Sequence, residues 1–133
     1  MPVGLDPAKM AAEKKERWKV MVENLGRHHK AGGKIVIGTD LIHSRDFFKD
    51  AVIPVPELKA LTSVGLSLQD AIKAGTIAAA EVVGTGAEEG LMEVGRLANL
   101  VAVKGRVDES FAALKRENVK LVMHYGTVIR REL

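Results

Sequence analysis

The chain has 133 residues, which is the length of one ordinary domain, and a domain of this size needs no disulfide or metal ion to fold. It contains no cysteine, so disulfide frameworks, thiolate metal sites and cysteine nucleophiles are excluded. Lys and Arg outnumber Asp and Glu by 20 to 17, but the two signs are interleaved, and aromatic residues make up only 4% of the chain. We interpret this charge as a solvated surface with no nucleic-acid partner, because stacking platforms for bases are scarce.

The N-terminus has no apolar signal region, and nowhere do about 18 apolar residues follow one another. We therefore expect a soluble, cytoplasmic protein with no membrane partner.

Residues 7–30 predict one long helix. Asp6 can cap it, and Pro7 suits the first helical position, where no amide hydrogen is needed. Four apolar residues recur at the i, i+3, i+4, i+7 spacing of one buried face: Trp18, Met21, Val22 and Leu25.

A short apolar run follows this helix almost at once. Gly32 and Gly33 end the helix, and the sequence KIVIG at 34–38 predicts a buried strand because it contains three consecutive β-branched residues. A helix followed by such a strand is typical of an α/β protein. The next loop, of about 15 residues, is long enough to be functional or to pack as a small lid.

Two further helices are predicted after this loop. Pro56 begins a short one that ends near Val64, and Ser67 caps a longer one over 67–83 that Gly84 ends.

The C-terminal part predicts three short strands. The sequence GTGAEEG at 84–90 lacks the spacing of a phosphate-binding loop and predicts a turn. A strand over 97–105 and a hairpin over 119–133, with Gly126 in its turn, are separated by a linker or short helix at 108–117.

Asp40 is the first candidate for chemistry, since it comes just after the predicted strand. At the carboxyl end of a parallel-type strand, a side chain projects into the crevice where α/β proteins place their sites. A carboxylate there can bind a metal or take a proton from metal-bound water, but it can equally cap a turn. His43 could join Asp40 at a metal or be an ordinary loop histidine. We interpret the other three histidines as surface residues: His28, His29 and His124.

Four blocks of the sequence resemble the C-terminal third of the metal-dependent amidohydrolase superfamily, especially its imidazolonepropionase-like and Xaa-Pro dipeptidase-like members. The blocks are HHKAGGKIVIGTD, GLSLQDAIKAGTIAAAEVVG, GLMEVGRLANLVAVKG and VKLVMHYGTVIRREL, and they occur in the family's order and spacing. Asn99 stands where the family usually has aspartate.

The resemblance implies a (β/α)8 barrel with a smaller β-sandwich built from both chain ends. Residues 1–84 would then be a barrel-derived helix–strand–helix–helix segment, and 85–133 would supply sandwich strands, together in one compact domain. The expected fold class is α/β, with α+β as the alternative. Asp40 matches the strand-eight aspartate, which binds a divalent metal such as zinc and acts as general acid and base, and His43 is a second candidate metal ligand.

The family's other metal ligands have no counterpart in these 133 residues: the His-x-His of strand one, the bridging lysine or glutamate of strand four, and the histidines of strands five and six. A barrel needs about 250 residues, and zinc takes three or four ligands. The strand at 34–38 would also leave open edges, which predicts a homo-oligomer, pairing with a missing N-terminal hydrolase half, or re-pairing with the C-terminal strands of this chain.

Four functions follow as hypotheses. The favoured one is a truncated amidohydrolase-like module without catalysis of its own. The second is a metal-dependent hydrolase of C–N bonds completed by a partner chain, with a binding or assembly module as a further alternative. Nucleic-acid binding is the least favoured.

Overall fold

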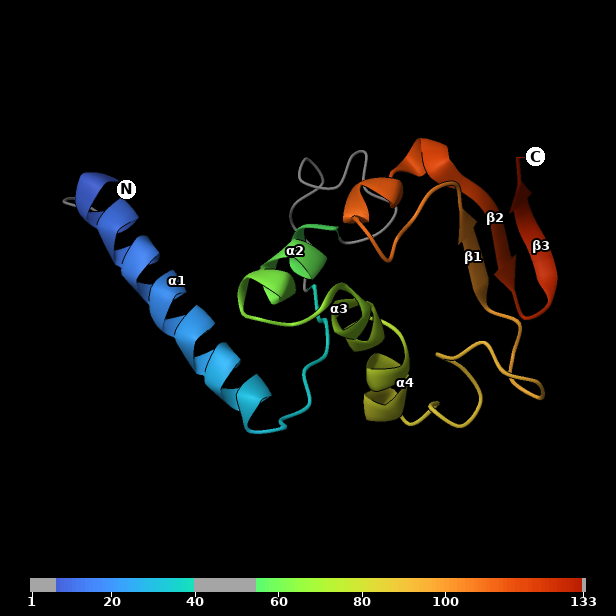
Figure 1. Cartoon of the computed structure of the whole chain (residues 1–133), viewed down its shortest axis with the longest axis horizontal. Helices are drawn as coiled ribbons and strands as arrows, with labels where there is room; N and C mark the ends of the chain where they lie inside the picture. The colour runs from blue at the N-terminus through green and yellow to red at the C-terminus, as the bar shows by residue number, and fades with distance from the viewer. Residues whose placement is uncertain (1–6, 40–54, 133) are drawn as a thin grey trace, which may run out of the picture.

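The computed structural model describes residues 7–39 and 55–132 (Figure 1). These residues form a mixed helical and β structure, in agreement with the expected class in its coarse form. The elements are, in order, α1 (Pro7–Lys30), α2 (Val55–Ser63), α3 (Leu68–Ala74), α4 (Ile77–Val83), β1 (Leu100–Val103), the 3-10 turns η1 (Phe111–Ala113) and η2 (Arg116–Asn118), β2 (Val119–His124) and β3 (Thr127–Arg131).

Helix α1 confirms the helix predicted over 7–30. In its last turn Arg27 and Lys30 place positive charge at the negative end of the helix dipole, and Gly32 leaves the helix with φ 79°. The predicted buried face is only half right. Val22 and Leu25 pack against the core, whereas Trp18 and Met21 are 52% and 47% exposed. Only the C-terminal half of α1 reaches the other described elements.

The strand predicted at 34–38 is not formed, because residues 33–39 lie in no helix or strand. Their burial still alternates as in a strand: Ile35 and Ile37 are half-buried against the core, and Val36 lies on the exposed side. A strand requires a neighbour that takes its backbone hydrogen bonds. No described strand lies beside this segment.

The helix predicted over 67–83 is also corrected, since it is two helices separated at Gly75 and Thr76. Its predicted ends are right. The Ser67 side chain accepts a hydrogen bond from the Asp70 amide, and Gly84 ends α4 with φ 88°.

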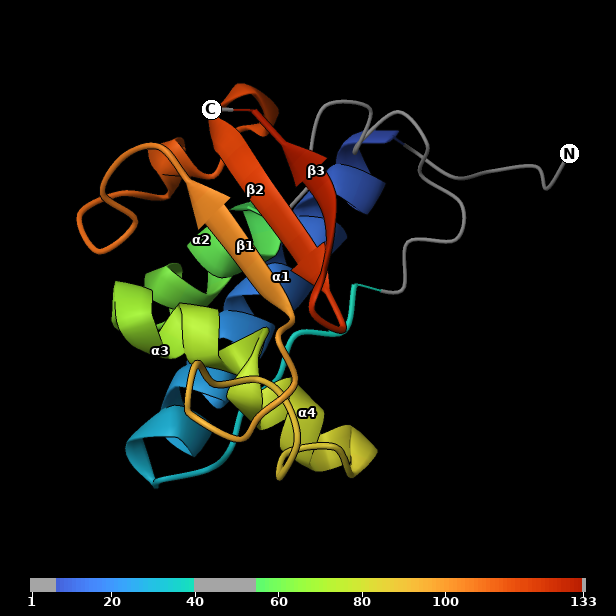
Figure 2. The same cartoon turned by 90° about the vertical axis from the view of Figure 1, so that its right-hand side faces the viewer.

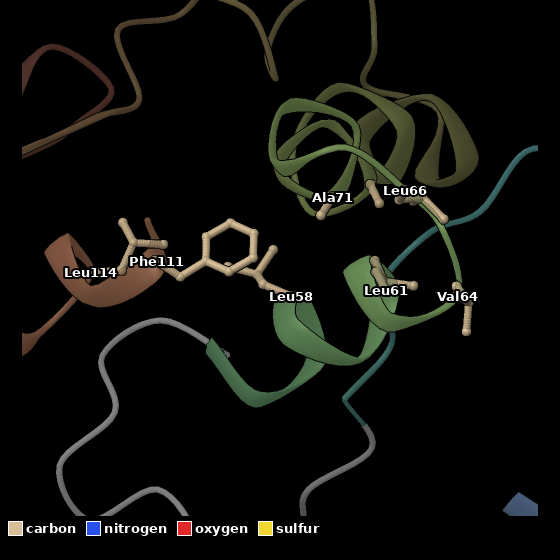
Figure 3. Packing of buried hydrophobic residues seen from close by; sticks show 8 residues of the cluster. Leu58, Leu61, Val64, Leu66, Ala71, Phe111 and Leu114 are labelled. Carbon is tan, nitrogen blue, oxygen red and sulfur yellow. The ribbon is translucent and has the colours of Figure 1, made fainter. Parts of the chain in front are cut away.

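The hydrophobic core joins α2, α3 and η1 (Figure 3). Figure 3 shows Phe111 beside Leu58 of α2 and Leu114 of the turn that follows η1. The core thus draws on both predicted segments, 1–84 and 85–133, while the division at 84 stays a prediction. Its buried members are Leu58, Leu61, Val64, Leu66, Ala71, Ala74, Phe111 and Leu114.

The three predicted C-terminal strands are confirmed as one antiparallel sheet of order β1-β2-β3 (Figure 2). Tyr125 and Gly126 form the two-residue hairpin turn, with φ 49° and 78°. Positive φ at both positions is typical of a type I′ turn, which suits the twist of a hairpin. Figures 1 and 2 together place the sheet on one side of α2 and α3, and α1 on the other. None of the described helices is long and apolar enough to cross a membrane.

Candidate functional site

The two predicted site residues, Asp40 and His43, lie outside the described residues. The structure therefore tests neither their roles nor their proximity. The described chain ends just before them, at Thr39, and resumes with Val55 at the start of α2.

A groove lies next to the two points at which the described chain stops and resumes. It has a volume of about 460 Å³ and runs between α1, residues 36–38 and the first turns of α2. We call it the α1–α2 groove. It is lined by Trp18, Met21, Leu25, Val36, Ile37, Gly38, Pro56, Glu57, Ala60 and Leu61.

Glu57 is the carboxylate that lines this groove, and it was not among the predicted site residues. Its Oε2 atom is buried and has no hydrogen-bond partner among the described residues. Its position in the first turn of α2 would suggest only a favourable interaction with the helix dipole. No local pattern in the sequence predicts that this oxygen is buried.

Metal ligands do not gather in the part of the chain that the structure describes. Residues 7–39 and 55–132 contain no group of three or more His, Asp or Glu residues that could hold a metal ion. His28 and His124 are exposed, as expected, and His29 is half-buried. The His28 ring contacts the backbone oxygen of Lys34 at 3.2 Å. The described residues do not by themselves fit a zinc ion, which takes three or four ligands.

Among the described residues, the carboxyl groups whose pKa is shifted belong to helix caps and loops. Hydrogen bonds from Ser67 and Lys73 lower the pKa of Asp70 at the start of α3. The Arg106 guanidinium, which donates to Asp108 at 2.9 Å and 2.6 Å, lowers the pKa of that carboxyl. Neither carboxylate lines the α1–α2 groove, so neither shift points to chemistry there.

A second cavity, of about 540 Å³, lies between the helices and β1. Its walls are largely apolar, and its two polar side chains are already occupied. Thr76 donates to the Ile72 carbonyl at 2.9 Å, and both ends of the Asn99 amide are hydrogen-bonded. The cavity therefore offers a ligand few directional contacts.

Asn99 connects the 84–90 turn to the hairpin. Its Nδ2 donates to Glu89 Oε2 at 2.7 Å, and its Oδ1 accepts from the Tyr125 amide at 2.8 Å. Hydrogen bonds from Thr85 and Asn99 lower the pKa of Glu89. An amide can donate and accept at once, which an aspartate carboxylate at this position could not do.

We expect the Asn99→Asp substitution to lower the melting temperature at about pH 7, because it replaces a donor to Glu89 with a second carboxylate. Because the pKa of Glu89 is lower in the folded state than in the unfolded state, its hydrogen bonds stabilise the fold when the pH is above the unfolded-state pKa. This stabilisation is lost as the pH falls through the folded-state pKa. The difference in melting temperature between the wild type and Asn99→Asp should therefore be large at about pH 7 and smaller at about pH 4, where carboxylates protonate. Thermal unfolding followed by circular dichroism at both pH values measures this difference. An equal loss at both would contradict the charge explanation.

The described residues combine a long helix, an apolar segment outside any helix or strand, three short helices and three antiparallel strands, and comparisons with known proteins identify the class of protein. Residues 4–129 match the model of the amidohydrolase family. The chain belongs to the amidohydrolase family, and it corresponds to a C-terminal portion of such a protein. No curated protein matches it.

Solved structures agree with this family. A prolidase complexed with N-methylphosphonate-L-proline is 28% identical, with a TM-score of 0.70 over 84% of this chain and 26% of the prolidase. A structure described as an amidohydrolase is also 28% identical, with a TM-score of 0.71 over 84% of this chain and 26% of that structure. A Xaa-Pro dipeptidase with methionine bound in its active site is 27% identical, with a TM-score of 0.65 over 82% of this chain and 25% of the dipeptidase. The chain thus spans about a quarter of the length of these structures.

Proposed function

We propose that residues 1–133 form the C-terminal segment of a metal-dependent amidohydrolase and do not catalyse hydrolysis on their own. The observation that carries this proposal is the unequal coverage, because 84% of this chain matches only 26% of the prolidase. The 133 residues also contain four histidines and no His-x-His sequence.

The reaction we propose for the completed protein is hydrolysis of C–N bonds, with dipeptide amides as the favoured substrate class. This choice is supported by the prolidase and the Xaa-Pro dipeptidase among the similar structures. Non-peptide amides are the alternative that the amidohydrolase family itself suggests.

In this proposal Asp40 supplies the general acid and base, and Asp40 and His43 bind a divalent metal, which activates the hydrolytic water when present. A zinc site of three or four ligands needs further residues beyond these two, and another chain or segment would provide them. A completed, active hydrolase is therefore the second candidate function. The apolar α1–α2 groove favours it, because a partner would cover that surface. We also propose a cytoplasmic location, which the absence of cysteine suits.

Purified 1–133, incubated with zinc and then desalted, should contain far less than one metal per chain by elemental analysis. It should not hydrolyse Xaa-Pro dipeptides or a panel of simple amides and esters. The Asp40→Ala variant is the matched control and should behave like the wild type. Stoichiometric zinc together with turnover, both lost in Asp40→Ala, would overturn the proposal.

A further inference from the structure

The cavity between the helices and β1 has a wall of apolar side chains that the core covers on one side only. These side chains touch the buried core and are themselves half-buried: Ile37, Ile72, Val103 and Val107. Val101 of β1 also lines the cavity and is 55% exposed, so the cavity opens to solvent beside this residue. Its volume of about 540 Å³ lies within the range of about 300–1,000 Å³ that is usual for small-molecule sites.

The lining of this cavity carries no charge. Among the residues that the structure describes, no Lys, Arg, His, Asp or Glu side chain lines it. Its two polar side chains, Thr76 and Asn99, already hydrogen-bond with the chain itself. A buried water needs about two to four polar partners, and a charged ligand would lose its hydration without an opposite charge to replace it. The walls therefore favour an uncharged, apolar occupant over water or an ion.

We propose that this cavity binds an uncharged, hydrocarbon-like small molecule, which contacts Ile37, Ile72 and Val103. The neutral lining matches a ligand without charge, and the removal of apolar surface from water supplies the free energy of binding. Apolar cavities of about 150 Å³ in other proteins bind benzene, so a larger cavity has room for an alkylbenzene. This site does not depend on the proposed hydrolase function, since it uses neither Asp40 nor His43.

The test uses the full chain of residues 1–133, with carbon-13 in the δ1 methyl groups of its isoleucines, and n-butylbenzene as the probe. The methyl resonances of Ile37 and Ile72, which line the cavity, should shift and saturate as the probe is added. The methyl resonance of Ile129, which is 64% exposed on β3, should not move. The anion 4-phenylbutyrate has the same carbon frame and should bind at least about tenfold more weakly, because its carboxylate would lose water in the cavity.

Two substitutions at Val101 change the cavity at its opening. Val101→Trp should weaken butylbenzene binding by at least about tenfold, because the indole ring takes the place of the ligand, and aromatic residues suit a strand. Val101→Thr keeps the side-chain volume but adds a hydroxyl, and should weaken binding by a smaller factor. The matched control is Val128→Trp, the same substitution on β3 at a residue that is 46% exposed and does not line the cavity. It should leave binding unchanged, and thermal unfolding verifies that each variant is folded.

Several outcomes would overturn this site. They are an absence of any shift at Ile37 and Ile72, or an equal shift at Ile129, which would indicate adsorption to the surface. Equal affinities for butylbenzene and 4-phenylbutyrate would overturn the ligand class. Resonances of Ile37 and Ile72 that move with protein concentration in the absence of the probe, and no longer do so in Val101→Trp, would identify a second copy of the chain as the occupant and overturn the small-molecule site.

Discussion

Replacing Phe111 with alanine should lower the free energy of unfolding of 1–133 by about 3–5 kcal/mol, the usual cost of deleting a buried phenyl ring. Phe111 is 5% exposed and packs between Leu58 and Leu114 (Figure 3). It attaches the C-terminal part of the chain to the helices. A loss of this size is a large share of the roughly 5–15 kcal/mol that stabilises an ordinary domain.

Urea unfolding followed by far-ultraviolet circular dichroism measures this loss, because Trp18 is exposed and would report poorly on the core. Met92→Ala is the control for shortening an apolar side chain at an exposed position, and it should change the free energy by no more than about 0.5 kcal/mol. A loss below about 1 kcal/mol for Phe111→Ala would contradict the role of the ring in the core.

Local signals in the sequence were sufficient for most element boundaries. Pro7 and the Gly32–Gly33 pair bracket α1, whose predicted range 7–30 is the observed one. The hairpin turn was predicted from Gly126, because positive φ is a local requirement that glycine meets. The strands before and after this turn were predicted from the alternation of apolar and polar residues.

The break between α3 and α4 combines a local signal, the Gly75–Thr76 pair, with a contact to a segment far away in the sequence, which local reasoning could not predict. The Ile37 amide donates to the Ala74 carbonyl at 3.0 Å, which is the acceptor that the amide of residue 78 would use in a continuous helix. The Ile37 side chain also packs close to Gly75, where an added Cβ would lie 3.2 Å from Ile37 Cδ1. A contact between residues almost 40 positions apart therefore occupies the end of α3, where Gly75 also caps the helix.

The candidate site shows a second limit of sequence reasoning. Apolar spacing identified Trp18 and Met21 as buried, yet both are exposed, because spacing indicates that a face is to be covered without indicating what covers it. The same holds for KIVIG, whose residues suit a strand but have no described strand beside them. Asp40 and His43 rest on the resemblance and stay predictions. The errors at 18, 21 and 34–38 lie together around the α1–α2 groove, which Trp18, Met21 and residues 36–38 line.

Gly90→Ala should be the most damaging of the glycine substitutions in the turn that precedes β1, with a loss of about 2–6 kcal/mol in the free energy of unfolding. Gly90 has φ +90°, and an added Cβ would lie 2.7 Å from Ile77 Cα and 3.1 Å from Ala80 Cβ. Positive φ costs a non-glycine residue about 1–3 kcal/mol, and overpacking against α4 adds about 1–3 kcal/mol.

Gly95→Ala separates these two costs. Gly95 has nearly the same backbone angle, φ +92°, but an added Cβ there meets nothing within 4 Å. It should therefore show the backbone cost alone, about 1–3 kcal/mol, and the difference between the two variants in urea unfolding measures how tightly the turn packs on α4. Equal losses would mean that the turn moves away from Ile77 at little cost, and the close packing of residue 90 on the helix would then contribute nothing to stability.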